Sequence, residues 1–160
     1  CEQSAVDSIW QSDRLVSAQP SLEAMSLMAA LAARTQRLKI GMTVVLVSHR
    51  DHLLIAQQCA TLDILSGGRL LPAFGVGSKF APEWKATGTD PNGRGERADE
   101  ALELLSRLWS EEQVSFEGRH YRYRDVSIAP RPTQQPLPLW ICQKKNIGGW
   151  QRPGRYASTL

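Results

Sequence analysis

The residues of this sequence whose types could do chemistry follow apolar segments. Asp13 comes shortly after a segment at 6–10 that alternates enough for a short strand. Its carboxylate could orient a cofactor, or transfer a proton if burial raises its pKa. It could equally bond to its own backbone in a loop. Arg14 beside it could bind an anion or simply neutralise Asp13, and the residues alone leave these alternatives open.

A second candidate group is Gly75, Val76 and Gly77, which leaves the apolar segment at 69–74. Glycine lets the backbone approach a ring or a phosphate closely, although such a glycine pair is equally typical of a plain turn. The spacing is not that of a dinucleotide-binding loop, because no third glycine follows, and no phosphate-binding Gly-Lys-Ser/Thr loop is present. Trp84, further along, could form an apolar lid or anchor its loop.

Other functional classes lack support. The histidines have no metal-ligand spacing and no serine lies in a nucleophile elbow, so we expect neither a metal site nor a Ser-His-Asp hydrolase. The net charge of +3 is too small to indicate a nucleic acid partner. No apolar run is long enough for a membrane span. Cysteines at widely separated positions (Cys1, Cys59 and Cys142) are typical of reduced thiols in a cytoplasmic protein.

Hydrophobic periodicity along the chain predicts alternating strands and helices that would position these residues. The predicted strands cover 6–10, 38–47, 69–74 and 137–142. The first predicted helix begins at 20–21, the second runs from about 51 to 65, and the third covers 94–110. We expect Asp51 to cap the second helix and Gly67 to end it. A hairpin over 114–123, a long loop over 81–95 and an extended proline-rich connector over 130–138 complete the pattern.

Each predicted helix carries an apolar stripe that should face the sheet. The stripes are Leu22, Met25, Met28, Leu31 and Ala32, then Leu54, Ile55, Cys59 and Leu62, then Ala98, Ala101, Leu102, Leu105, Leu108 and Trp109. On the outer face of the third helix we expect a solvated ion pair between Arg97 and Glu100.

The order of elements predicts an α/β fold with a parallel sheet, either doubly wound or part of an eight-stranded barrel. Ligands bind beyond the carboxyl ends of the strands in both architectures. We therefore expect a site among residues 12–14, 43–44, 75–78 and 141–143.

From about residue 6 to residue 141 the sequence resembles the luciferase-like monooxygenase superfamily. The resemblance rests on Thr61-Leu62-Asp63, Leu65-Ser66-Gly67-Gly68-Arg69, Phe74-Gly75-Val76-Gly77, the helix after Arg94, Pro130-Arg131-Pro132, Pro136-Leu137-Pro138 and Trp140-Ile141. It implies a partial (β/α)8 TIM barrel over residues 1–142, holding strands 2 to 5 with a β-hairpin insertion. Residues 143–160 would be a divergent tail without periodicity, as is typical of a poorly ordered segment.

The resemblance also implies a function. Members use the deazaflavin coenzyme F420 or reduced FMN for hydride or electron transfer with a small-molecule substrate, in some cases as monooxygenases, and are often dimers. The motifs of this sequence are more similar to those of the F420-dependent members, so F420 is the expected cofactor and FMN the alternative. Carried over residue by residue, the cofactor contacts fall on Asp13, Thr43, Val44, Gly75, Val76 and Gly77. Asp13 is the catalytic candidate, while Arg14 stands where many members have a histidine.

An eight-stranded barrel takes about 250 residues, so the chain resembles a truncated copy. The leading hypothesis is an F420- or FMN-dependent oxidoreductase. The alternative is an inactive truncated remnant that acts only through protein–protein association. A doubly wound nucleotide-binding domain is a third reading, and it lacks a phosphate-binding loop.

Overall fold

A parallel sheet forms one layer of the molecule. The computed structural model describes residues 5–142 and 157–159. Within these residues the sheet has the spatial order β1-β2-β3-β6-β7, and every neighbouring pair is parallel. The strands are β1 (Ser8–Gln11), β2 (Lys39–Leu46), β3 (Leu70–Gly75), β6 (Leu139–Ile141) and β7 (Ala157–Thr159). The spatial order follows the chain order, without the reversal that a doubly wound sheet requires.

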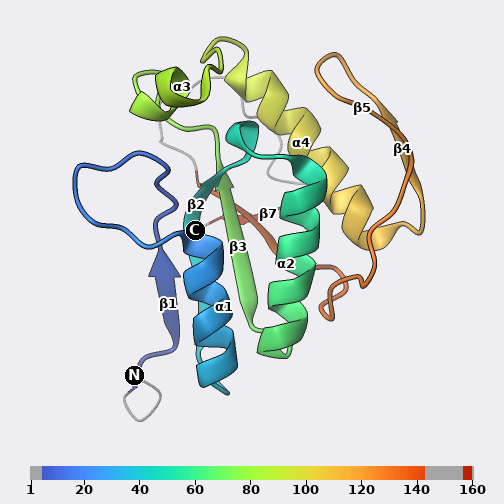
Figure 1. Cartoon of the computed structure of the whole chain (residues 1–160). Helices are drawn as coiled ribbons and strands as arrows, with labels where there is room; N and C mark the ends of the chain where they lie inside the picture. Colours follow the sequence, from blue (N-terminus) through green and yellow to red (C-terminus); the bar gives the residue numbers. More distant parts are fainter. Residues whose placement is uncertain (1–4, 143–156, 160) are drawn as a thin grey trace.

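Helices connect the strands and cover one face of this sheet. The helical segments among the described residues are α1 (Ala24–Arg34), the 3-10 turn η1 (Val47–His49), α2 (His52–Ser66), α3 (Pro82–Thr87) and α4 (Arg94–Ser110). Figure 1 shows α1, α2 and α4 on the same side of the sheet. This is the arrangement expected when successive right-handed crossovers all proceed in one direction.

The ends of α2 confirm the predicted caps. The carboxylate of Asp51 accepts a hydrogen bond from the Leu54 N–H at 2.9 Å, which satisfies one of the free donors at the helix start. Gly67 ends the helix in the left-handed conformation with φ of 65°, which glycine adopts without steric cost.

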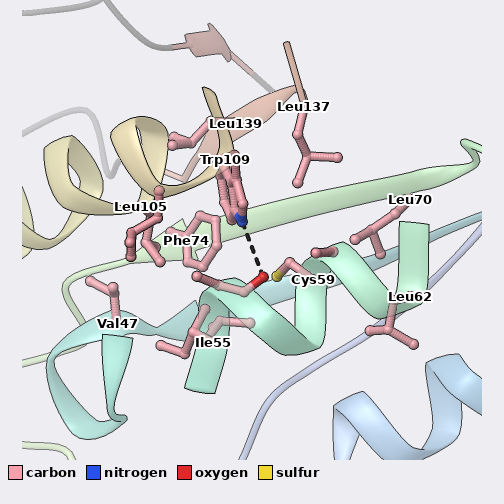
Figure 2. Close-up of a cluster of buried hydrophobic side chains, with 14 of the residues drawn as sticks. Val47, Ile55, Cys59, Leu62, Leu70, Phe74, Leu105, Trp109, Leu137 and Leu139 are labelled. Carbon is pink, nitrogen blue, oxygen red and sulfur yellow. Dashed lines mark hydrogen bonds between the residues drawn. The ribbon is translucent and has the colours of Figure 1, made fainter. Parts of the chain in front are cut away.

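The hydrophobic core lies between the sheet and the helices (Figure 2). Phe74 from β3 and Trp109 from α4 lie with ring centroids 6.3 Å apart. The buried indole N–H of Trp109 donates to the Ala56 carbonyl of α2 at 3.1 Å. Cys59 is fully buried beside them, and burial raises the pKa of its thiol to about 12. This thiol therefore acts as a small apolar side chain.

Arg69, just before β3, joins the amino ends of the strands to the ends of two helices. Its guanidinium donates five hydrogen bonds of 2.5–3.2 Å, which reach the carbonyls of Ala32, Thr35, Leu38 and Ser66 and the hydroxyl of Thr35. Carbonyls at the end of a helix have no partner within the helix, so Arg69 completes the last turns of α1 and α2.

The fully buried carboxylate of Asp63 fixes the proline-rich connector in the same region. Its oxygens accept hydrogen bonds from the backbone N–H of Gln134 at 2.8 Å and from the side-chain amide of Gln134 at 2.6 Å. The connector leads from the antiparallel hairpin β4 (Val114–Glu117) and β5 (Arg122–Val126) into β6. The Thr-Leu-Asp and Ser-Gly-Gly-Arg motifs thus hold the amino edge of the sheet.

Several sequence predictions were wrong in detail. The first helix begins at Ala24, where Glu23 caps it, so Leu22 precedes the helix and is 67% exposed. Leu54 is 54% exposed, because Ile55 takes the inward position and the next residue back points about 100° away. The segment at 81–95 is not a continuous loop, since it contains α3.

The predicted pair of Arg97 and Glu100 does not form. Arg97 donates instead to the carbonyls of Asp90 and Asn92. Glu100 accepts three backbone N–H groups of the hairpin turn, from residues 119–121. Burial opposes its ionisation, but these N–H groups hold the pKa of Glu100 below its usual value. The two side chains serve separate backbone segments, so no solvated pair remains.

The predicted tail at 143–160 lies mostly outside the described residues. The exception is β7, which pairs in parallel with β6 through Leu139 and Ala157. No strand was predicted at these positions from the sequence.

Candidate functional site

The carboxyl edge of the sheet brings the predicted residues of β2 and β3 together. The β2–β3 register shifts between Met42 and Val45, and the Thr43–Val44 peptide bond within this bulge is cis. The bulge presses against β3, because a Cβ placed on Gly75 would lie 2.6 Å from the Val44 Cγ2. Only glycine at this position allows the contact.

The loop that leaves β3, residues 75–81, continues along the same edge and is called the exit loop below. Gly77 has φ of 71°, and a Cβ there would lie 3.2 Å from Leu46. The side chain of Val76 is partly buried against the core, so Val76 offers mainly backbone to a ligand. The predicted residues from 43–44 and 75–77 therefore lie together at this end of the sheet, where the Val44 side chain covers Gly75.

Asp13 lies beyond the carboxyl end of the neighbouring strand β1 and is only 6% exposed. Arg50, after β2, donates to both carboxylate oxygens of Asp13, at 2.7 Å and 3.1 Å. Arg50 also bonds to Glu23 at 3.2 Å. Burial disfavours the charge of Arg50, but its contacts with the two carboxylates raise its pKa, so it remains a cation. Arg50, not the exposed Arg14, neutralises Asp13.

Trp84 of α3 anchors the exit loop. It is 4% exposed, and its indole N–H donates to the Ser78 carbonyl at 2.7 Å. The ring of His49 lies against it, with centroids 3.9 Å apart and planes 43° apart. A buried and bonded side chain of this kind is an anchor, which decides between the two roles that the sequence left open for Trp84.

Several buried polar atoms near this edge have no hydrogen-bond partner. They are the Ser48 hydroxyl, both ring nitrogens of His49, and the Trp140 indole nitrogen. Burial lowers the pKa of His49, although the nearby carboxylates of Glu83 and Asp13 act in the opposite direction. Buried groups without partners are uncommon in folded proteins and gather where a ligand or ordered water completes the bonding.

Sequence reasoning missed Arg50, Glu23 and His49 as members of this region. Arg50 and His49 follow a predicted strand directly, so the strand-end rule used for Asp13 would have included them. Glu23 gives no such signal, because it lies at the start of α1 and reaches the site only through Arg50.

The residues that the structure describes contain neither a metal-binding cluster nor a helix that could cross a membrane. In 5–142 and 157–159, histidines, cysteines and carboxylates nowhere gather in a group of three or more that could hold a metal ion. Over the same residues, every helix is too short or too polar to cross a membrane.

Comparison with known proteins places the chain in a family. Residues 1–142 match the model of the luciferase-like monooxygenase family, and the chain belongs to this family. It is 34% identical over 151 residues to the F420-dependent glucose-6-phosphate dehydrogenase of Kineococcus radiotolerans, covering 88% of this chain and 43% of that protein. It is 32% identical over 119 residues to the FMNH2-dependent dimethylsulfone monooxygenase of Pseudomonas putida, covering 72% of this chain and 32% of that protein.

A solved structure shows the same likeness. The chain matches an F420-dependent secondary alcohol dehydrogenase in complex with an F420-acetone adduct, with a TM-score of 0.78 and 26% identity. The match covers 88% of this chain and 44% of that one. The chain thus spans less than half the length of the relatives it matches.

Proposed function

We propose that this chain forms part of an oxidoreductase that binds coenzyme F420 at the carboxyl edge of its sheet. The contact between Val44 and Gly75 carries this proposal. It joins the β2 bulge to the start of the exit loop, and the half-buried Val44 side chain fills the place where a side chain at residue 75 would lie. We expect a planar tricyclic ring to stack against this small apolar side chain, which a partial (β/α)8 barrel would present at its mouth.

The residues along this edge fit a polar, planar cofactor. The amides of Ser78 and Lys79 have no hydrogen-bond partner among the described residues, and the indole N–H of Trp140 is buried without one. These donors suit the carbonyl oxygens of a deazaflavin or flavin ring. When bound, such a ring supplies the hydride or electron transfer, and the protein supplies position and electrostatics.

Asp13 is proposed to orient the cofactor or its partner groups from the end of β1. Both of its oxygens are held by Arg50, which fixes the carboxylate in one direction. A carboxylate held on both oxygens is better suited to accept one further hydrogen bond than to carry a proton back and forth. We therefore assign Asp13 to orientation.

Two of the three relatives described above are named for F420, which favours F420 over FMN. The Kineococcus dehydrogenase and the secondary alcohol dehydrogenase are named for F420, and the Pseudomonas monooxygenase for reduced FMN. F420 is the proposed cofactor and FMN the alternative. The substrate would be a small molecule.

Titration of the intact protein with F420 and separately with reduced FMN tests this function. F420 should bind more tightly, seen as a saturable change in its fluorescence. Asp13→Asn should weaken binding about tenfold, because one oriented charge-assisted hydrogen bond is lost. Asp7→Asn is the matched control, since Asp7 forms only an exposed ion pair with Lys39. Binding of neither cofactor would contradict the proposal and favour a role in protein association alone.

A further inference from the structure

Two consecutive carbonyls of the exit loop are held by side chains from outside it. The indole N–H of Trp84 donates to the Ser78 carbonyl at 2.7 Å. The guanidinium of Arg94, at the start of α4, donates to the preceding carbonyl, that of Gly77, at 3.4 Å. The backbone N–H of Ala81 also reaches the Ser78 carbonyl, at 3.1 Å. The loop is thus tied toward α3 and α4, which lie beside the ends of β2 and β3 in Figure 1.

The Trp84 ring lies close to two other segments at this end of the sheet. A Cβ on Gly77 would lie 3.6 Å from the Trp84 ring, so this part of the exit loop passes close to the ring to which Ser78 is bonded. His49 of η1 lies against the ring as well, at 3.9 Å between centroids. Neither ring nitrogen of His49 has a hydrogen-bond partner, so His49 acts on Trp84 through its ring surface. Trp84 therefore links the end of β2 to the loop that leaves β3.

Holding these carbonyls also sets the direction of the amides that follow them. In a trans peptide the N–H points opposite to the C=O of the same peptide unit. With the carbonyls of Gly77 and Ser78 turned toward α3 and α4, the N–H groups of Ser78 and Lys79 point away from those helices. Both amides are without a partner among the described residues, so they remain available to an oxygen atom of a ligand.

We propose that Trp84 is a positioning residue, which fixes the exit loop so that its backbone and the amides of Ser78 and Lys79 meet the cofactor. The role rests on the proposed function, and it adds a residue outside the predicted cofactor contacts. Loss of the indole N–H leaves the Ser78 carbonyl with one donor fewer and loosens the loop before any ligand arrives.

The variant Trp84→Phe tests the role, with Trp109→Phe as the matched control. Each substitution removes an indole N–H from a buried tryptophan bonded to one backbone carbonyl. Trp109 lies in the core between α2 and α4 (Figure 2), so its loss should lower stability alone. Trp84→Phe should raise the Kd for F420 about tenfold, the effect of losing one well-formed hydrogen bond, while Trp109→Phe should change it less than about twofold.

Trypsin provides a second readout that needs no cofactor. Lys79 is exposed within the exit loop, and Arg119 in the hairpin turn is an exposed reference site. The ratio of cleavage after Lys79 to cleavage after Arg119 should rise at least fivefold in Trp84→Phe and stay unchanged in Trp109→Phe, since a loosened loop enters the protease more often.

The outcomes separate the two proposals. If the wild-type protein binds F420 or FMN and Trp84→Phe binds it equally well, the positioning role is wrong and the proposed function stands. An unchanged cleavage ratio in Trp84→Phe also overturns the role, because the loop would then be fixed without Trp84. If the wild-type protein binds neither cofactor, the proposed function is wrong, and positioning for a cofactor with it.

Discussion

Replacing Arg69 should be among the most damaging single changes outside the hydrophobic core. Arg69→Met keeps most of the aliphatic length and removes all five hydrogen bonds of the guanidinium. A hydrogen bond from a charged donor contributes about 1.5–3 kcal/mol net. Arg69 is half-buried, so water can reach some of the freed carbonyls, and we expect a loss of about 3–5 kcal/mol rather than the full sum. The loss is large against a total stability of about 5–15 kcal/mol.

Urea unfolding followed by circular dichroism measures this effect. With a slope of about 2 kcal/mol/M, the midpoint should fall by about 1.5–2.5 M. Arg69→Lys should lie between Met and the wild type, because one ammonium cannot reach carbonyls on both α1 and α2. Arg124→Met is the control, since Arg124 is exposed and should change stability by less than about 0.5 kcal/mol. If Arg69→Met costs less than about 1 kcal/mol, these hydrogen bonds do not join the helix ends as reasoned.

Three other changes test other parts of the fold. Gly75→Ala should cost about 1–3 kcal/mol and weaken cofactor binding, because its Cβ would lie 2.6 Å from the Val44 Cγ2. Adding Val44→Ala should restore both in urea and titration experiments, and a double variant without recovery would refute this contact. Asp63→Asn turns an amide N–H toward the donors of Gln134 and should cost about 2–3 kcal/mol, or roughly 5–10 °C by calorimetry, where a shift under about 1 °C would count against it. Burial lowers the pKa of His52, so on acidification His52 is protonated in the unfolded chain before it is protonated in the folded protein. Stability should therefore fall as the pH drops below about 6.5. Urea curves at about pH 7.5 and 5.5 measure the slope, which His52→Gln should reduce, and equal slopes would place the pH dependence elsewhere.

The sequence predicted the long elements well and the short ones poorly. The helix over 94–110 was confirmed with its bounds, because its 17 residues repeat one apolar stripe several times. α3 has only 6 residues, too few for periodicity, although the proline at its start and Gly88 at its end are boundary signals that were available. Leu54 was misplaced because a stripe read from spacing is uncertain by one residue, which turns a side chain by about 100°.

The site was predictable only where it follows strand ends. The contact between Val44 and Gly75 joins two predicted residues, as the parallel sheet requires. The pairing of Asp13 with Arg50 spans 37 residues and depends on how β1 and β2 align, which no local pattern encodes. Asp13 thus remains a proposed cofactor residue whose actual partner came from the structure.

The Ser-Gly-Gly-Arg motif that ends in Arg69 lies at the opposite end of the sheet from the proposed cofactor surface. Arg69 precedes β3 and Gly75 ends it, so six residues at about 3.3 Å each separate them by about 20 Å. Substitutions this far apart, without shared partners, have additive effects on stability. A change of ligand preference at residues 75–78 should therefore leave the contribution of Arg69 intact, and a stabilising change near Arg69 should carry over unaltered into any such variant.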